Sequence, residues 1–283
     1  MLDLVSGKVV QYIVSLSGGI GSYITLKRVI SKYGKENVKA VFCDTLYEDG
    51  DLYLFLEKIE KNLNIEVVRL CSGKTPVQLQ VENKFVFNSR VALCSKELKS
   101  KVFNQWLKEN YTPEECILFM GIDWSEQHRC EAITKNYMPY KVEYPLCEEM
   151  LYKQEYFNEL KNDGIELPRL YKIGLTHNNC GGRCVKAGIG HWLQLLEKDR
   201  NRFIEAENDE LALQRIIGNG YTHLKRKGKP YSLHQLRMDK EKQFTIFDFE
   251  ECNDFGACSC FSEIEEENEE IEVEQNEKSN RRN

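Results

Sequence analysis

Short apolar runs alternate with amphipathic segments along the first half of the chain. Runs of aliphatic residues predict buried strands, here at residues 12–16, 38–43, 66–70, 116–121 and 137–144. Apolar residues that recur every three or four positions predict helices, here over residues 23–33, 52–63 and 98–106. This alternation predicts the α/β class: a Rossmann-like, doubly wound parallel sheet with ligand sites beyond its C-terminal strand ends.

The pattern changes near residue 148, where helical segments and cysteines replace the strand–helix alternation. Residues 148–161 look helical, and a further helix is expected over residues 185–203. We therefore expect three parts: an α/β domain over residues 1–147, a helical, cysteine-containing extension over residues 148–262, and a tail over residues 263–283.

The net charge of −6 comes from the tail. Residues 263–283 hold nine glutamates against three basic residues, so the other 262 residues carry 36 basic and 36 acidic side chains. With so little apolar content the tail should be disordered, and it would act in solubility or, alternatively, as a mimic of nucleic acid.

Composition limits the location of the protein. No run of 18 apolar residues occurs, which predicts no transmembrane helix and no membrane partner. Residues 1–4 lack the basic and apolar regions of a signal peptide, so we expect a cytoplasmic protein. The eleven cysteines should then be reduced thiols, some of them metal ligands, rather than disulfides.

One loop carries the clearest candidate chemistry. Ser17-Gly18-Gly19-Ile20-Gly21-Ser22 follows the first expected strand and opens the first expected helix. Its glycines leave backbone N–H groups uncovered, and the helix N-terminus adds partial positive charge, so the loop can bind a phosphate. It matches neither the Walker pattern nor Gly-x-Gly-x-x-Gly. The alternative is a tight strand-to-helix turn without a ligand.

The loop resembles the PP-loop of the adenine nucleotide alpha-hydrolase superfamily, with Ser-Gly-Gly-x-x-Ser after the first strand. The nearest likeness is to the phosphoadenylyl-sulfate (PAPS) reductase-like branch, which includes phage-type proteins, so a phage- or mobile-element origin is one option. Three further blocks follow in the order of that branch: Asp44-Thr45, Arg90 to Lys99, and Gly121-Ile122-Asp123 with Glu126 and Arg129. The resemblance covers about residues 10–200.

This resemblance implies a HUP-type nucleotide-binding domain for ATP, or for PAPS or APS, with cleavage at the α-phosphate. The residues that it implies for nucleotide binding are Ser17, Gly18, Gly19, Gly21, Ser22, Asp44, Thr45, Gly121 and Asp123. Those that it implies for catalysis are Cys94, Asp44, Lys96 and Arg129. The loop would hold the leaving pyrophosphate while cations offset the developing charge.

The sequence departs from the usual PP-loop pattern at a position that contributes to Mg²⁺ binding. Many PP-loops carry Asp at the fifth position, where it assists Mg²⁺, but this chain has Gly21. Carboxylate ligands for Mg²⁺ would then come from Asp44, Glu48, Asp49 or Asp123. Alternatively, Glu48 and Asp49 cap the following helix, and the sequence leaves both options open.

Two pairs of cysteines form a candidate metal site. Cys180 and Cys184 flank two glycines, and Cys258 and Cys260 follow about 74 residues later. Four thiolates brought together would suit Zn²⁺ or a 4Fe–4S cluster, although these spacings are not those of common zinc ribbons. Two histidines, His177 and His191, could each replace one thiol.

A basic stretch over residues 225–242 contains seven Lys or Arg residues against two acidic ones. It could bind the phosphates of RNA or DNA, or it could be a solvated loop.

The sequence therefore predicts an enzyme, an ATP pyrophosphatase or adenylating transferase that cleaves the α–β phosphate bond and adenylates an acceptor. The acceptor would be a nucleic acid or a small molecule, and the purpose sulfur transfer or nucleobase modification. A PAPS/APS reductase-like enzyme is the first alternative, but the C-terminal Glu-Cys-Gly-x-His-like segment of such enzymes is missing. A nucleotide- or nucleic-acid-binding protein without catalysis is the second. A homo-oligomer is compatible with this sequence.

Overall fold

The structure, a computed structural model, describes residues 10–88, 91–218 and 220–242. The acidic tail, Arg90, Cys258 and Cys260 therefore lie outside the described residues. Within the described ranges, none of the helices combines the length and the apolar character that crossing a bilayer requires.

A five-stranded sheet forms the centre of the molecule, in the order β3-β2-β1-β4-β5, and all four pairings are parallel. Its strands are β1 (Gln11–Ser15), β2 (Val38–Asp44), β3 (Val67–Cys71), β4 (Cys116–Met120) and β5 (Lys141–Glu143). The chain builds outward from β1 on one side and then on the other, so the strand order reverses between β1 and β4. In sheets of this kind, the crevice beyond the strand ends at such a reversal is the usual ligand site.

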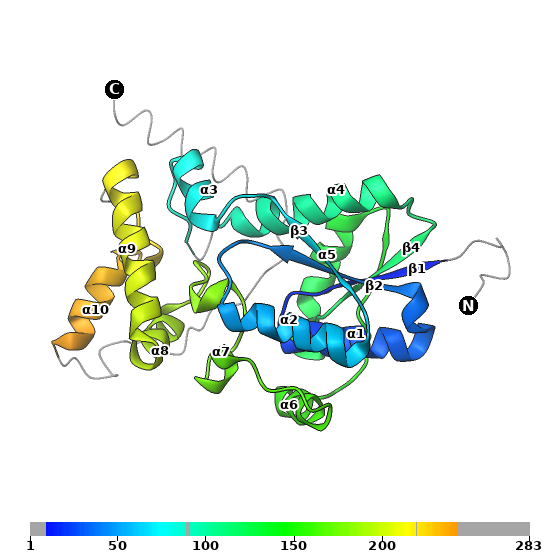
Figure 1. The fold of residues 1–283 in the computed structure, drawn as a ribbon. Helices are drawn as coiled ribbons and strands as arrows, with labels where there is room; N and C mark the ends of the chain where they lie inside the picture. The colour runs from blue at the N-terminus through cyan, green and yellow to red at the C-terminus, as the bar shows by residue number, and fades with distance from the viewer. Residues whose placement is uncertain (1–9, 89–90, 219, 243–283) are drawn as a thin grey trace.

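Helices cover both faces of the sheet, which confirms the doubly wound α/β class (Figure 1). One face carries α1 (Ile20–Tyr33), α2 (Gly50–Leu63) and α6 (Lys153–Asn162), and the other carries α4 (Lys101–Asn110) and α5 (Cys130–Tyr137). Successive strand residues alternate between the faces. Val14 packs toward α1, whereas Ile13 packs toward α4 and α5, and both are fully buried.

Shorter elements connect this framework. They are η1 (Lys35–Asn37), α3 (Pro76–Asn83), the π-helical turn η2 (Lys96–Ser100), η3 (Trp124–Arg129) and η4 (Pro145–Cys147). Helix α6 begins five residues later than the sequence pattern indicates, and its Tyr156 and Leu160 pack in the same core as α1.

The remaining elements form a second core around the buried Trp192 and Phe203. They are α7 (Arg169–Lys172), η5 (Cys180–Gly182), α8 (Ile189–Lys198), α9 (Arg200–Ile217), the hairpin β6 (Leu224–Arg226) and β7 (Lys229–Tyr231), and α10 (Leu233–Glu241). The sequence indicated one helix across residue 199. The structure has two, because the Asp199 side chain accepts a hydrogen bond from Arg202 N and caps α9. The division into domains at residue 148 stays a prediction.

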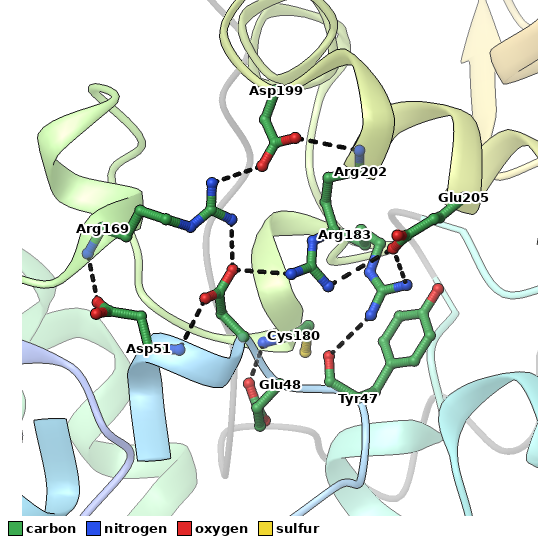
Figure 2. Close-up of polar contacts among 10 residues, drawn as sticks. Tyr47, Glu48, Asp51, Arg169, Cys180, Arg183, Asp199, Arg202 and Glu205 are labelled. Carbon is green, nitrogen blue, oxygen red and sulfur yellow. Dashed lines mark hydrogen bonds and ion pairs between the residues drawn. The ribbon is translucent and has the colours of Figure 1, made fainter. Parts of the chain in front are cut away.

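Ion pairs hold the helical part against the loop between β2 and α2 (Figure 2). The buried Asp49 carboxylate accepts from Arg169 and, at 3.1 Å, from Arg202. Burial opposes ionisation of Asp49, but the hydrogen bonds from Arg169 and from Asp51 N outweigh it and hold the pKa of Asp49 below its usual value. Asp49 also caps α2 through Asp51 N at 2.9 Å, so the capping alternative is confirmed for this residue.

Glu48 makes a second connection. Its buried carboxylate accepts from Thr45 Oγ1 at 2.9 Å and from the backbone N–H of Cys180, and it lies 3.9 Å from Lys99 Nζ. Glu48 and Asp49 thus tie the cysteine-rich segment and α7 to the end of β2. This docking fixes where residues 176–179 lie relative to the Ser17–Ser22 loop.

Candidate active site

The Ser17–Ser22 loop runs from the C-terminal end of β1 into α1, as expected. Gly18 has φ +77°, and a Cβ added there would lie 2.7 Å from Cδ1 of the buried Leu52, so conformation and space both require glycine. Ser22 Oγ donates to Gly19 O at 2.8 Å and accepts from Ser17 N at 3.1 Å. Hydrogen bonds of the two serines therefore link the first and last residues of the loop.

The first backbone N–H groups of α1 belong to Ile20, Gly21 and Ser22. Ile20 N donates to the Tyr171 hydroxyl at 3.2 Å. Among the described residues, the N–H groups of Gly21 and Ser22 have no hydrogen-bond partner. Because unpaired N–H groups at a helix N-terminus attract anions, this end of α1 suits a phosphate.

Gly21 lies against Gly121 at the end of β4. A Cβ on Gly121 would lie 2.8 Å from Ser22 N, and one on Gly21 would lie 3.2 Å from Gly121 O. The loop and the strand end thus approach so closely that an Asp at position 21 would press on the β4 backbone. This close approach is a physical reason for glycine at position 21.

A cavity of about 520 Å³ opens at this point, beyond the ends of β1 and β4. The sequence-predicted residues that line it are Ser17, Gly19, Gly21, Ser22, Gly121, Asp123 and Arg129. The far wall comes from α6, α7 and the segment before η5, through residues that include Tyr152, Lys153, Tyr171, His177, Asn178 and Asn179. It lies in the crevice where the sheet order reverses.

Two cations line the cavity. Arg129 is buried and pairs with Glu126 Oε1 at 2.6 Å. Lys153 Nζ donates to the Thr176 carbonyl and lies 5.0 Å from the centre of the Tyr171 ring. Burial lowers the pKa of Lys153, so a bound anion that restores charge compensation would be favoured there.

His177 and Asn178 complete the far wall. Burial, followed by the charges of Lys153 and other neighbouring groups, lowers the pKa of His177 to about 4, so its ring is neutral at pH 7. Asn178 is buried and donates from Nδ2 to Gly18 O at 2.9 Å. Its Oδ1 is buried and has no partner among the described residues, so it is available to a donor on a ligand.

The far-wall residues were not predicted as nucleotide contacts. They lie outside the motifs, and for His177 the sequence suggests only a metal-ligand role. The sequence Thr176-His177-Asn178-Asn179 before the cysteines was the one available signal, since adjacent polar residues in a loop often serve a site.

Other predicted site residues lie outside this cavity. Asp44 Oδ1 accepts from Leu46 N at 2.8 Å and from the Tyr53 hydroxyl at 2.9 Å, and Thr45 is buried against Glu48. These contacts order the end of β2. The cavity lining does not include Gly18, Asp44 or Thr45.

Cys94 and Lys96 lie just before and in the π-helical turn η2. Cys94 is half-buried against a small apolar cluster that includes Phe87 and Val185, and Lys96 begins η2. The cavity lining contains neither residue. Their assignment to catalysis stays a prediction.

The candidate thiol site is described only in part. Cys180 and Cys184 are hydrogen-bonded to each other, and this bond, burial and the Glu48 carboxylate raise the pKa of the Cys180 thiol. His191 Nε2 lies 2.7 Å from Gly182 O. Within the described ranges, no three His, Cys, Asp or Glu side chains come together as metal ligands. A four-thiol site with Cys258 and Cys260 lies outside what the structure describes.

Magnesium has a candidate ligand in the cavity. Asp123 Oδ1 accepts from Ser125 N at 2.9 Å and from Ser125 Oγ at 2.6 Å, which orients the carboxylate at the cavity edge. Mg²⁺ usually takes one or two carboxylates together with water and substrate phosphates. Asp123 beside a phosphate-binding loop fits that pattern.

No protein-family model and no curated protein sequence matches the chain. Among solved structures, it is similar to phosphoadenylyl-sulfate (PAPS) reductase from Candida auris, solved as a phosphate complex. That match has 13% identity, covers 59% of this chain and 79% of the reductase, and has a TM-score of 0.43. It is also similar to NH₃-dependent NAD synthetase from Campylobacter jejuni subsp. jejuni NCTC 11168 in complex with the nitrate ion, with 15% identity, coverage of 73% and 83%, and a TM-score of 0.39.

At these identities and TM-scores, the similarity concerns the fold alone and transfers no activity.

Proposed function

We propose that this protein is a PP-loop enzyme that binds ATP in the cavity beyond β1 and β4 and cleaves the bond between the α- and β-phosphates to adenylate an acceptor. The observation that carries the proposal is the pair of N–H groups without a partner at the start of α1, those of Gly21 and Ser22, beside a cavity that Arg129 and Lys153 also line. Fixed N–H donors and cations are what a leaving pyrophosphate needs.

The pyrophosphate would lie against the N–H groups of Gly21 and Ser22. Lys153 comes from α6 and Arg129 from η3, so the two cations can contact different phosphates. Arg129 would exchange its bond to Glu126 for a bond to a phosphate oxygen. The Asp123 carboxylate would hold Mg²⁺, which supplies charge compensation on the phosphates when bound.

The nucleoside would lie along the far wall. The free Oδ1 of Asn178 can accept a hydrogen bond from a ribose hydroxyl or an adenine amino group, while its Nδ2 stays on Gly18 O. One side chain would thus couple the nucleoside to the shape of the phosphate loop. This double role favours a nucleotide over inorganic phosphate as the ligand.

An aromatic pair at the cavity edge supports an acceptor with a planar ring. Tyr152 is 66% exposed, and its ring meets that of Trp124 edge to face with centroids 5.6 Å apart. Trp124 is held by its Nε1 donating to Leu151 O at 2.8 Å. Exposed aromatic rings beside a polar cavity suit stacking of a nucleobase, so a nucleobase is the acceptor that we favour.

Product analysis tests this function. The protein would be incubated with Mg²⁺ and ATP labelled at the α- or the γ-phosphate, with single-stranded RNA, DNA or nucleosides as acceptors. Release of pyrophosphate, with α-label on AMP or on an acceptor, is expected. An Arg129→Met variant should lose this activity, whereas Arg215→Met, at an exposed position on α9, should keep it. Products limited to ADP and phosphate, or no products while ATP binds, would contradict the proposal.

A further inference from the structure

A second cavity, of about 530 Å³, lies between α1 and the segments that follow β4 and β5. Cys130, at the start of α5, and Cys147, at the end of η4, both line it and are both half-buried. Their Sγ atoms lie 3.7 Å apart. A small molecule in this cavity can therefore reach two neighbouring thiols.

The same two thiols adjoin the candidate active site. Cys147 Sγ lies 3.3 Å from Ile122 O and 3.6 Å from Asp123 O, and can donate to either carbonyl. Cys130 directly follows Arg129 in the chain. Ile122, Asp123 and Arg129 all line the nucleotide cavity. Cys130 and Cys147 therefore adjoin residues that form the wall of this cavity.

We propose that Cys130 and Cys147 form a thiol–disulfide modification site whose oxidation to an intramolecular disulfide weakens nucleotide binding in the adjoining cavity. The oxidant is a low-molecular-weight disulfide that enters the second cavity. Cys130 and Cys147 combine contact with the wall of the nucleotide cavity with access to a second cavity.

The oxidation is two successive thiol–disulfide exchanges. The Cys130 thiolate attacks one sulfur of the small disulfide, forming a mixed disulfide and releasing one small thiolate. The Cys147 thiolate then attacks Sγ of Cys130, forming the internal disulfide and releasing the second small thiolate. The two protein protons pass to the released thiolates, so two protein thiols are oxidised and one small disulfide is reduced.

The order of attack follows from the contacts of the two thiols. The Cys147 S–H can donate to the Ile122 and Asp123 carbonyls, at 3.3 Å and 3.6 Å, which holds this thiol against the wall of the nucleotide cavity. We therefore write Cys130 as the first nucleophile, and the reverse order yields the same internal disulfide and the same two released thiolates.

Disulfide formation changes the cavity wall in two ways. The sulfurs must close from 3.7 Å to about 2.05 Å, which draws the start of α5 and the end of η4 together. Cys147 also loses the S–H that can donate to Ile122 O. Because Asp123 caps η3, which carries Arg129, the displacement reaches the residues proposed to contact Mg²⁺ and phosphate. We expect the dissociation constant for ATP to rise about 5-fold or more.

The experiment compares the full chain treated with oxidised glutathione or with dithiothreitol. Peptide mapping should find a Cys130–Cys147 disulfide only in the oxidised sample, and calorimetry should find the weaker ATP binding there. Cys130→Ser should bind ATP equally under both treatments, whereas Cys71→Ser, at an exposed cysteine away from both cavities, should behave as wild type. Absence of the disulfide, or equal ATP affinity with the disulfide formed, would overturn the inference.

The expected effect on ATP binding rests on the proposed function. A second measurement, made without nucleotide, therefore tests the disulfide site independently of that function. Hydrogen exchange in residues 122–129 should differ between the oxidised and reduced proteins without any nucleotide. If the reduced protein does not bind ATP, the proposed function fails. In that case, peptide mapping of the Cys130–Cys147 disulfide and hydrogen exchange in residues 122–129 still test the modification site. Hydrogen exchange that does not differ between the oxidised and reduced proteins would overturn it.

Discussion

Asn178 Nδ2 donates a hydrogen bond to the Gly18 carbonyl at 2.9 Å and joins segments 160 residues apart in the chain. Gly18 is the residue that gives the phosphate loop its positive φ, and Asn178 lies in the far wall of the cavity. The loop therefore depends for its shape on a segment that belongs to a different part of the sequence.

Asn178→Ala should weaken ATP binding about 10-fold. The change leaves the Gly18 carbonyl without its partner and removes the acceptor proposed for the nucleoside, at a cost of about 1–3 kcal/mol. Isothermal titration calorimetry with ATP measures the effect. Asn158→Ala, at an exposed position on α6, is the control and should bind as wild type. Equal affinities for the two variants would remove Asn178 from the site.

Lys153→Met should lower ATP affinity about 10-fold with little change in stability, because a charge-assisted contact to phosphate is worth about 1.5–3 kcal/mol. The methionine replaces the ammonium group, which lies over the Tyr171 ring, with an uncharged side chain of similar length. Binding is measured by calorimetry at low and high salt. Lys161→Met, exposed on the same helix, is the control. If both variants bind ATP alike, Lys153 does not face a phosphate.

Gly121→Ala should damage both the fold and the site. The new Cβ would meet the Ser22 backbone at 2.8 Å, so the end of β4 or the start of α1 must move, at a cost of about 1–3 kcal/mol. Urea unfolding and ATP titration should both show the change. Gly50→Ala adds a methyl group where nothing lies within 4 Å, and it should leave both measurements unchanged. A fully stable Gly121→Ala that binds ATP would show that the close approach is dispensable.

Asp49→Ala should destabilise the protein by about 3 kcal/mol, since it leaves Arg202 and one side of Arg169 without a buried partner and removes the cap of α2. Chemical unfolding measures this loss. Glu166→Ala breaks only exposed ion pairs and should cost less than about 1 kcal/mol. A loss for Asp49→Ala no larger than that for Glu166→Ala would disprove the docking role.

His177 should make stability depend on pH. Its pKa is about 4 in the folded protein and about 6.5 in the unfolded chain, so between these values the unfolded chain binds the proton and the folded protein does not. Stability therefore falls as the pH decreases from 6.5 to 4, by up to about 1.4 kcal/mol per pH unit from this residue. The slope, measured by urea unfolding at several pH values, should be smaller in His177→Asn than in the wild type. Equal slopes in the two proteins would refute the assignment.

The sheet and the phosphate loop could be predicted because their signals are local. Apolar runs and helical spacing depend on contiguous residues, and Gly18 with the two serines forms one short motif. Gly121 could be predicted as a site residue because it belongs to another short motif, Gly121-Ile122-Asp123. The structure adds that its missing Cβ allows contact with the loop.

The far wall could not be predicted, because its residues meet the loop only through tertiary packing. Lys153 on α6 looks like an ordinary solvated lysine in the sequence, and Tyr171 like a core residue. Whether Asp49 holds a metal or caps a helix was open for the same reason: the answer depends on arginines more than 100 residues away. Asp199 was missed as a cap since the apolar spacing continues across it.

A crystal structure with α,β-methylene-ATP, whose α–β bond is not cleaved, tests nucleotide binding at the Ser17–Ser22 loop most directly. We expect its terminal phosphates within hydrogen-bond distance of Gly21 N and Ser22 N, with Lys153 and Arg129 on the phosphate oxygens. A nucleotide bound elsewhere on the protein, or a cavity beside Ser17–Ser22 without the nucleotide at saturating concentration, would contradict it.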